Sequence, residues 1–203
     1  MKQKCAVITG ASRGIGAAAA ERFAAGGWNL ALSCVRSRET LEELARRLHA
    51  KWGITCLTYM GDMGREEAVR EFFGRIEESF GGAGVLVNNA GISRVGLLEE
   101  MPLEEWEEVL RTNVTSVFLC SKAAIPFMLH KKSGAIINVS SVWGCVGASC
   151  EAAYSASKGA VNALTQALAK ELAPSGIAVN AVACGAVDTD MNACFSPEER
   201  QEI

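Results

Sequence analysis

Tyr154 and Lys158 are separated by one turn of a predicted helix, in the segment Tyr154-Ser155-Ala156-Ser157-Lys158. Side chains at positions i and i+4 share one helix face, so the phenol and the ammonium group are expected to lie together. A free tyrosine has a pKa of about 10, which makes it a poor acid–base catalyst at neutral pH, but an adjacent ammonium group stabilises the phenolate and lowers that pKa. The pair is therefore suited to proton transfer.

Ser141 precedes Tyr154 by thirteen residues and ends an apolar, strand-like segment. Its hydroxyl can donate a hydrogen bond to the oxygen of a substrate carbonyl. With hydride delivered to the carbonyl carbon and a proton from Tyr154 to the oxygen, the three side chains would reduce a ketone to a secondary alcohol. A Tyr-x-x-x-Lys spacing alone is more often a surface pair, and it is the combination with Ser141 and a glycine-rich loop that favours catalysis.

That glycine-rich loop joins the first predicted strand to the first predicted helix, with the sequence Thr9-Gly10-Ala11-Ser12-Arg13-Gly14-Ile15-Gly16. Glycines let the backbone turn tightly and approach a pyrophosphate, which the amides at the helix N-terminus then stabilise. A tight turn without a ligand is the alternative, but the position between strand and helix favours a dinucleotide site. The expected contacts are Gly10, Ser12, Arg13, Gly14, Ile15 and Gly16.

The end of the second predicted strand indicates which nicotinamide cofactor binds. Folds that prefer NAD place an acid about 20 residues after the glycine loop, where it holds the ribose hydroxyls. This chain has no carboxylate in the segment 32–38 and carries Arg36 and Arg38 instead. Because guanidinium groups pair well with phosphate, Arg13 and Arg36 are expected to bind the 2′-phosphate of NADPH. The alternative is that Arg36 and Arg38 begin a solvated helix.

Around these residues, short apolar segments alternate with helical patterns. The predicted helix at 38–52 places Leu41, Leu44, Ala45 and Leu48 on one face. Near-continuous apolar strands separated by helices indicate a doubly wound parallel sheet, a Rossmann fold with three αβα layers. The predicted strands are 4–9, 29–35, 54–60, 84–88, 134–140 and 177–183, and the predicted helices are 14–26, 38–52, 64–79, 102–130 and 153–173.

Polar and glycine residues follow these strands, at what would be the carboxyl edge of the sheet. Asp62 follows the third strand and could accept a hydrogen bond from the adenine amino group, or it could cap the next helix. The turn at 88–91 would form the floor beneath the adenosine ribose, although such turns also occur without a ligand. The contributors to that floor are Asn88, Ala90 and Gly91.

These motifs resemble the short-chain dehydrogenase/reductase family over nearly the whole chain. The matching segments are T-G-x-x-x-G-I-G at 9–16, N-N-A-G at 88–91, N-V-S-S at 138–141 and Y-x-A-S-K at 154–158. The resemblance implies that Asn113 holds a water that relays protons to Lys158, and that Lys158 also binds the nicotinamide ribose. It further implies cofactor contacts from Met63, Asn89, Gly185, Val187 and Thr189.

Two features depart from the family pattern. The family usually has Pro-Gly after the sixth strand, where this chain has Cys184-Gly185. Family members also continue with a seventh strand and a last helix, whereas this sequence ends at Ile203, inside the segment from Asn192 that the resemblance identifies as a substrate lid. We expect one nicotinamide-binding domain over 1–203 that lacks the last strand and helix. The alternative from another class is an inactive fragment that binds NADPH without turnover.

Within the family, the chain is most similar to bacterial 3-oxoacyl-acyl-carrier-protein reductases. The segments that carry this likeness are 138–141, 180–182 and 189–191. It implies a carrier-bound ketone substrate, an acyl carrier protein as partner and a role in fatty acid biosynthesis. Those enzymes dock their acidic carrier on basic residues beside the pocket. Lys131 and Lys132 could serve here, but Ser175 stands at the second such position.

The segment 143–151 also resembles a sister group that reduces a ketone attached to a lysine of elongation factor P. In such an enzyme, Glu151 could face a cationic group of the substrate. Its alternative role is that of an acid at a helix N-terminus, where the helix dipole favours negative charge. We expect the acyl-carrier substrate and keep the elongation-factor substrate as the alternative.

Composition narrows the classes of partner. A formal net charge of −3 and a pI of about 5.5 give no basic footprint for nucleic acid. The first apolar run is too short for a signal peptide or a membrane span, so we expect a cytoplasmic protein without a membrane segment. The helix that carries Tyr154 and the helix at 102–130 match those through which relatives assemble, so a homo-oligomer is expected.

Eight cysteines raise the question of disulfides or a metal. None forms a C-x-x-C pair, and only His49 and His130 could add imidazole ligands. Most of the cysteines lie in apolar segments, where a reduced thiol behaves as a small hydrophobe. We therefore expect structural cysteines and no metal site, with Cys145 and Cys150, close to the proposed site, as candidates for a reactive thiol.

Overall fold

The computed structural model describes residues 4–189, which form a six-stranded parallel sheet with the order β3-β2-β1-β4-β5-β6. The strands are β1 Cys5–Ile8, β2 Asn29–Cys34, β3 Cys56–Met60, β4 Val85–Asn88, β5 Gly134–Ser141 and β6 Ile177–Cys184. The strand order reverses between β1 and β4, and in doubly wound folds ligands bind beyond the carboxyl ends of the strands at this point. The predicted Rossmann-type α/β fold is confirmed.

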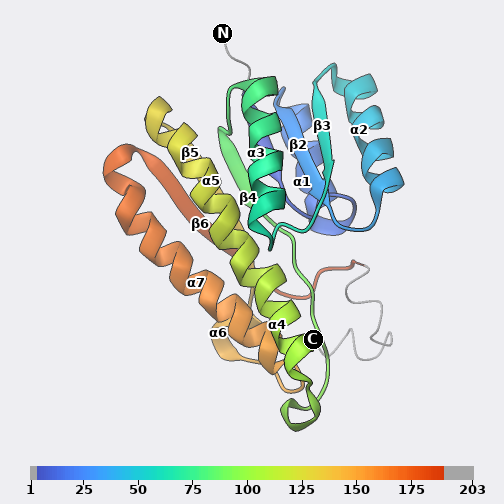
Figure 1. Ribbon diagram of the computed structural model, residues 1–203, viewed down its shortest axis with the longest axis vertical. Helices are drawn as coiled ribbons and strands as arrows, with labels where there is room; N and C mark the ends of the chain where they lie inside the picture. Colours follow the sequence, from blue (N-terminus) through green and yellow to red (C-terminus); the bar gives the residue numbers. More distant parts are fainter. Residues whose placement is uncertain (1–3, 190–203) are drawn as a thin grey trace.

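Helices cover both faces of the sheet (Figure 1). Because successive strand residues point to opposite faces, Ile8 and Leu32 belong to one core cluster, whereas Val7 and Ala31 belong to the other. The first cluster includes side chains of α1 Gly14–Ala25 and α2 Arg38–Trp52, and the second those of α3 Glu66–Phe80, α5 Ser116–Lys131 and α7 Ala152–Leu172. The result is the predicted αβα arrangement.

β6 forms one edge of the sheet. Ile177 and Val179 are buried against the helices, but Val182 is 54% exposed. No strand pairs with the outer side of β6 within residues 4–189. The described part of the chain therefore contains six strands, as expected from the sequence.

The helix predicted at 102–130 is confirmed as one helix over Leu103–Lys131. It consists of α4 Leu103–Leu110, a π-helical turn Arg111–Thr115 and α5. The sequence did not predict the π-turn, where the buried amide of Asn113 takes partners outside the helix. Such π-turns often mark functional sites. The short elements that the sequence did not predict are η1 Leu98–Glu100, α6 Trp143–Val146 and η3 Ala173–Ser175.

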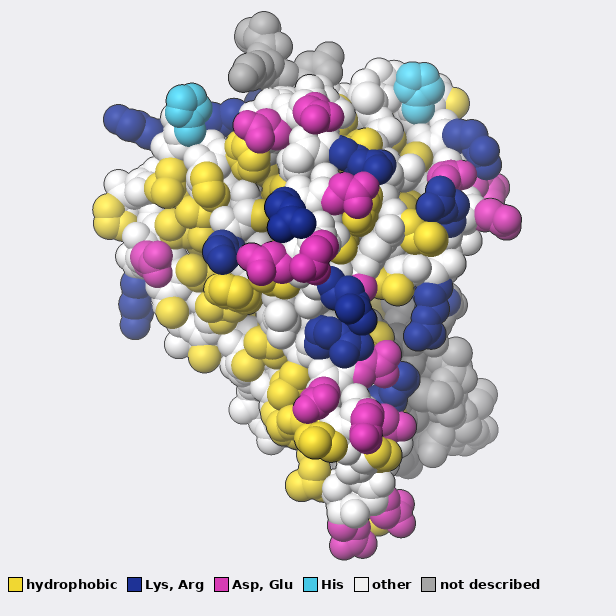
Figure 2. Space-filling view, in the orientation of Figure 1, with side chains coloured by type: hydrophobic (Ala, Val, Ile, Leu, Met, Phe, Trp, Pro, Cys, Tyr) yellow, Lys and Arg dark blue, Asp and Glu magenta, His cyan; other side chains and the backbone are white. Residues whose placement is uncertain are grey.

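The segment Leu103–Lys131 is long and apolar enough to cross a membrane, judged by length and composition alone. However, Cys120, Ala124 and Met128 of this segment are fully buried in the core cluster formed with the sheet and α3. A core helix of a folded domain has the same composition. On the face drawn in Figure 2, acidic, basic and apolar side chains of the described residues are interspersed, and neither sign of charge dominates.

Candidate active site

The loop between β1 and α1 is fastened to the turn that follows β4. The hydroxyl of Thr9 accepts hydrogen bonds from the backbone N–H groups of Asn89 and Ala90, both at 3.0 Å. Nδ2 of Asn89 donates to the carbonyl oxygens of Thr9 and Gly10, also at 3.0 Å. Four hydrogen bonds therefore hold the two loops side by side where the strand order reverses.

Glycines are required where this loop turns into α1. Gly10 has a φ of +62°, and a Cβ there would lie 2.8 Å from Cα of Ala90. A Cβ at Gly16 would lie 2.5 Å from the carbonyl oxygen of Gly10. The first turn of α1 contains no acidic residue, so its free N–H groups can receive an anion. This cradle fits the pyrophosphate of a nicotinamide dinucleotide.

The arginines predicted to choose the cofactor lie on neighbouring loops. Arg13 follows β1 and Arg36 follows β2, and both are exposed. The N–H of Ala11 donates to the carbonyl of Ser33 at 2.9 Å, which ties the ends of these strands together. Arg38 is the first residue of α2, and its Nη1 lies 3.9 Å from Oε1 of Glu42. For Arg38, the alternative that it begins a solvated helix is therefore confirmed.

Asp62 organises the turn between β3 and α3. Its Oδ1 accepts the N–H of Gly64 at 2.8 Å, and its Oδ2 lies 3.5 Å from Nε of Arg111. Because α3 begins only at Glu66, Asp62 is not the helix cap, and that alternative is wrong. The adenine contact stays a prediction. Met63 is buried in the core beneath this turn.

The side chain of Asn88 is buried and hydrogen-bonded inside the core, and its part in the floor beneath a ribose stays a prediction. Its Nδ2 donates to Oγ of Ser121 at 3.2 Å and to Oδ1 of Asn138 at 2.9 Å. Asn138 in turn donates to Oγ1 of Thr165 at 2.8 Å. Asn88 still belongs to β4, and its place in the strand alternation turns it toward α5 and α7. The turn that follows Asn88 consists of Asn89, Ala90 and Gly91, which are partly exposed.

Ser141, Tyr154 and Lys158 meet at the carboxyl end of β5. Ser141 is the last residue of that strand, and its side chain is hydrogen-bonded to the phenol of Tyr154. Nζ of Lys158 lies 5.5 Å from the centroid of the Tyr154 ring and donates to the carbonyl of Val139 at 2.7 Å. The structure therefore brings the three predicted groups together.

Burial dominates the electrostatics of this cluster. It raises the pKa of Tyr154; the hydrogen bond with Ser141 opposes the rise, and Glu151 and Cys184 add to it. Burial also lowers the pKa of Lys158 to about 8. The pKa of the phenol is therefore raised and not lowered as predicted, because burial disfavours the charged phenolate. A protonated phenol is the form that can donate a proton.

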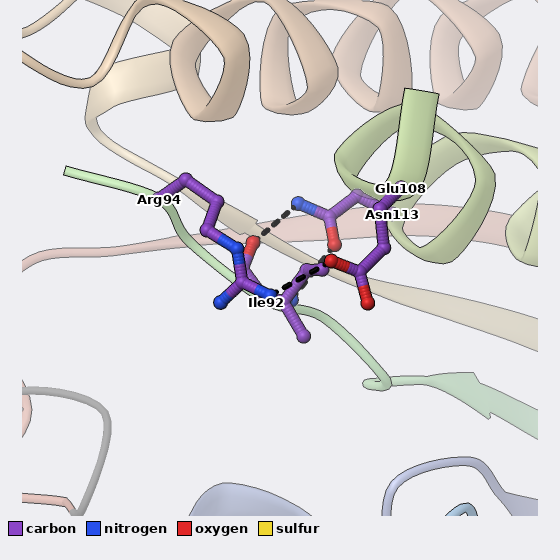
Figure 3. A network of polar contacts seen from close by, with 4 residues as sticks. All are labelled: Ile92, Arg94, Glu108 and Asn113. Atoms are coloured by element: carbon purple, nitrogen blue, oxygen red, sulfur yellow. Dashed lines mark hydrogen bonds and ion pairs between the residues drawn. The ribbon is translucent and has the colours of Figure 1, made fainter. Parts of the chain in front are cut away.

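Asn113 connects the segment after β4 to the helix that carries Tyr154, and Figure 3 shows its contacts with Ile92 of that segment. Its Oδ1 accepts the N–H of Ile92 at 2.8 Å, and its Nδ2 donates to the carbonyl of Ile92 and to Oγ of Ser157, both at 2.9 Å. Oγ of Ser157 donates to the carbonyl of Tyr154 at 2.7 Å. Both N–H bonds of the amide are thus used by the protein, and the water relay stays a prediction.

Two glycines lie close to Lys158. A Cβ at Gly91 would lie 3.5 Å from Nζ of Lys158, an ordinary van der Waals distance, so the turn after β4 runs beside the ammonium group. A Cβ at Gly144 would lie 2.6 Å from the carbonyl carbon of Lys158, so a side chain here would push α6 away from α7. Gly144 was not predicted as a site residue, although it follows Ser141 by only three positions, which could have indicated that it lies near the site.

The segment after β6 returns to the glycine loop. A Cβ at Gly14 would lie 3.4 Å from Cγ2 of Thr189, which places this predicted contact beside the cradle. Gly185 and Val187 lie between β6 and Thr189 and are exposed. The predicted lid from Asn192 onward lies outside the described residues.

Lys131 and Lys132 do not lie beside the site of their own chain. They stand at the end of α5, immediately before β5, whose other end carries Ser141. β5 has eight residues and is therefore about 25 Å long. Ser175 lies before β6, at the same amino edge of the sheet. The prediction that these lysines dock a carrier beside the site of their own chain is therefore wrong, because they lie at the amino edge of the sheet and the site lies at the carboxyl edge.

The described cysteines are free thiols. Burial raises the pKa of Cys5 and Cys120 to about 12 and that of Cys56 to about 11, so these thiols are unreactive parts of the structure. Within residues 4–189 no cluster of histidine, cysteine and acidic side chains could hold a metal ion. The free thiols are Cys5, Cys34, Cys56, Cys120, Cys145, Cys150 and Cys184.

The fold and this arrangement of residues agree with the comparison with known proteins. Residues 4–200 match the short chain dehydrogenase family. The chain is 42% identical to the 3-oxoacyl-[acyl-carrier-protein] reductase FabG of Staphylococcus aureus over 200 residues, which cover 98% of this chain and 81% of the relative. It is 40% identical, with the same coverage, to the uncharacterized oxidoreductase YmfI of Bacillus subtilis.

A third relative is the 3-oxoacyl-[acyl-carrier-protein] reductase FabG of Vibrio cholerae, 39% identical over 208 residues that cover 98% of this chain and 80% of the relative. The chain therefore belongs to the short chain dehydrogenase family. It is an oxidoreductase that acts on CH–OH or C=O groups, and its family binds a nicotinamide cofactor.

Proposed function

We propose that this chain uses NADPH to reduce a carrier-bound ketone to a secondary alcohol, as a 3-oxoacyl-[acyl-carrier-protein] reductase. The observation that carries the proposal is the convergence of Ser141, Tyr154 and Lys158 at the carboxyl edge of the sheet, which also carries the glycine cradle. The printed function of the relatives from Staphylococcus aureus and Vibrio cholerae supports the choice of substrate. We also propose that residues 1–203 form one nicotinamide-binding domain.

When bound, NADPH supplies the hydride that adds to the carbonyl carbon. Ser141 donates a hydrogen bond to the carbonyl oxygen and orients it toward Tyr154. Tyr154 then transfers its phenolic proton to that oxygen as negative charge develops there. The raised pKa of the buried phenol keeps this proton in place until it is needed.

Lys158 has two tasks in this proposal. Its ammonium group holds the hydroxyls of the nicotinamide ribose, and it restores the proton that Tyr154 gives up, by way of a water held at Asn113. A pKa of about 8 suits the second task, because the group can release and regain a proton near neutral pH.

NADPH is preferred over NADH because of the charges at the ends of β1 and β2. Arg13 and Arg36 are exposed on adjacent loops there, and no acid occupies the segment 32–38. A 2′-phosphate is a fit ligand for two guanidinium groups. Asp62 and the segment 185–189 complete the proposed cofactor site.

We also propose a cytoplasmic homo-oligomer that assembles through α5 and α7. The side chains of Phe118 and Leu129 on α5 are 48% and 42% exposed. Exposed apolar surface is unfavourable in water, and burial against a second copy of the chain would remove it from water. The partners proposed for the site are a small or carrier-bound ketone and an acyl carrier protein.

The test is cofactor binding followed by turnover. Titration with NADPH and NADH, monitored by cofactor fluorescence, should show tighter binding of NADPH, and a 3-oxoacyl thioester should then oxidise the bound NADPH. Tyr154→Phe should bind NADPH as the wild-type chain does and lose roughly a thousandfold in turnover, because the general acid is removed. Wild-type chain that binds NADPH and never oxidises it would contradict the proposal in favour of an inactive binding protein.

A further inference from the structure

The segment after β4 is tied to the amino end of α7 at two positions besides Asn113. Oγ of Ser93 donates to Oε1 of Glu151 at 2.7 Å, and the N–H of Gly96 donates to the carbonyl of Cys150 at 2.8 Å. Glu151 is the N-cap residue of α7 and stands three residues before Tyr154. These contacts fix one wall of the site to the turn of helix that carries the phenol.

The backbone beside Glu151 is strained. Cys150 has a φ of +59°, a left-handed conformation that costs a non-glycine residue about 1 kcal/mol or more. In this conformation its carbonyl receives the N–H of Gly96. On the other side, the N–H of Ala148 donates to Oγ of Ser155 at 3.0 Å, so the loop is wrapped around the first turn of α7. Strain of this kind persists only where the surroundings hold it in place.

The charged and titratable groups around the phenol can be named element by element. From α7 come Glu151 and Lys158, and from β6 comes Cys184, while β5 contributes the neutral hydroxyl of Ser141. The nearby Arg94 is paired with Glu108 of α4 at 2.7 Å, so these two charges offset each other (Figure 3). Among the described residues, Glu151 is the carboxylate whose charge acts on the phenol of Tyr154.

We propose that Glu151 is a positioning residue for proton donation by Tyr154: through Ser93 it clamps the segment after β4 onto the amino end of α7, and it places a carboxylate three residues before the phenol. The inference rests on the proposed function in so far as Tyr154 is the proton donor. The two roles are separable by substitution. Ser93→Ala removes the clamp and leaves the charge, whereas Glu151→Gln removes the charge and leaves an oxygen that can accept from Ser93.

Ionisation of Tyr154 can be measured directly, because the chain has only two tyrosines. The other, Tyr59 on β3, donates to Glu71 at 3.0 Å, and Tyr59→Phe leaves Tyr154 as the single phenol. In the Tyr59→Phe chain, ultraviolet absorbance of tyrosinate against pH gives the midpoint of Tyr154. Adding Glu151→Gln should move that midpoint to lower pH, because a like charge is removed.

The same titration has two controls. Ser93→Ala should leave the midpoint in place, because the carboxylate is still present. Glu66→Gln should also leave it in place, since Glu66 is an exposed acid in the first turn of α3, where its carboxylate lies 3.9 Å from Nζ of Lys122. An unchanged midpoint in Glu151→Gln, or an equal shift in Glu66→Gln, overturns the proposed role of the charge.

Kinetics with NADPH and a 3-oxoacyl thioester test the clamp. Ser93→Ala should raise KM about fivefold, the equivalent of one lost hydrogen bond of about 1 kcal/mol, without moving the pH profile. Glu151→Gln should move the alkaline limb of the kcat profile to lower pH. Unchanged KM in Ser93→Ala overturns the clamp. A shifted tyrosinate midpoint in a chain that never turns over would support the role of the charge and refute the proposed function, so the two failures are distinguishable.

Discussion

Cys184 lies directly opposite Ser141, at the last paired position of β5 and β6. Its carbonyl accepts the N–H of Val142 at 2.9 Å, which holds the ends of the two strands together beyond Ser141. The thiol is partly exposed, and its charge would act on both Tyr154 and Lys158. A free thiol therefore stands beside the three groups that we propose to be catalytic, at the position where the resemblance to the family implies proline.

Modification of Cys184 should block turnover. Methylthiolation with methyl methanethiosulfonate is expected to lower kcat/KM on the order of a hundredfold, because displacements of about 1 Å at a catalytic site have effects of this size. Cys184→Ala should resist the reagent, and a reducing agent should restore the wild-type chain. Cys145→Ala and Cys150→Ala are the matched controls, since both thiols are exposed, and both variants should stay sensitive. Loss of activity in Cys184→Ala at the wild-type rate would place the sensitive thiol elsewhere.

Removal of the Asn113 amide should weaken the whole fold as well as the site. Asn113→Ala leaves the partly buried N–H and carbonyl of Ile92 without their partner and takes a donor from Ser157. The expected loss in the free energy of unfolding is about 2 to 4 kcal/mol, measured by urea denaturation. Asn180→Ala, at an exposed position of β6, is the control and should change stability little. Equal stability of the two variants would show that the network around Asn113 is not stabilising.

The sheet was predictable because its signals are local. Strands such as β1 and β2 are short, fully buried and mostly apolar, and their alternation with helices along the chain indicates a parallel, doubly wound sheet. The convergence of the proposed catalytic groups was predictable for a related reason. Ser141 ends a strand, Tyr154 and Lys158 share a helix face, and the ends of parallel strands meet at one edge.

What could not be predicted depends on contacts between distant residues. The π-turn at Arg111–Thr115 has no composition of its own and follows from the partners that Asn113 finds on Ile92 and Ser157. The contact between Ser93 and Glu151 joins residues 58 positions apart. The direction of the Tyr154 pKa shift depends on how deeply the phenol is buried, which neither its type nor its spacing from Lys158 reveals.

Arg36 should matter for NADPH and not for NADH. Arg36→Ala is expected to weaken NADPH binding about tenfold, the effect of one charge-assisted contact of 1.5 kcal/mol or so, and to leave NADH binding unchanged. Fluorescence titration with each cofactor measures both constants. Arg38→Ala is a suitable control because Arg38 lies on α2 near Glu42, and its binding constants should match those of the wild-type chain. Equal losses for NADPH and NADH in Arg36→Ala would exclude the proposed contact with the 2′-phosphate.

Burial of Lys158 should make stability depend on pH in a defined direction. Its pKa is about 8 in the folded chain and 10.5 without the environment of the fold. Between these values the unfolded chain binds the proton more strongly, so the free energy of unfolding rises with pH. The cost of the buried charge is fully present below pH 8, is relieved as pH rises toward 10.5, and amounts to at most about 3 kcal/mol.

Lys158→Met should therefore abolish turnover and stabilise the chain at neutral pH. A methionine fills much of the same volume without a charge, so the expected gain is about 1 to 2 kcal/mol at pH 7, reduced by the lost hydrogen bond to Val139. Urea denaturation from pH 7 to 10 should show a free energy of unfolding that rises with pH in the wild-type chain relative to the variant. Tyr154 and the buried thiols act in the opposite sense, because their raised pKa values mean that the native chain keeps protons that the unfolded chain loses. These groups are present in both chains, so the difference between the two profiles isolates the lysine, and a difference that does not change with pH would show that Lys158 is not the group responsible.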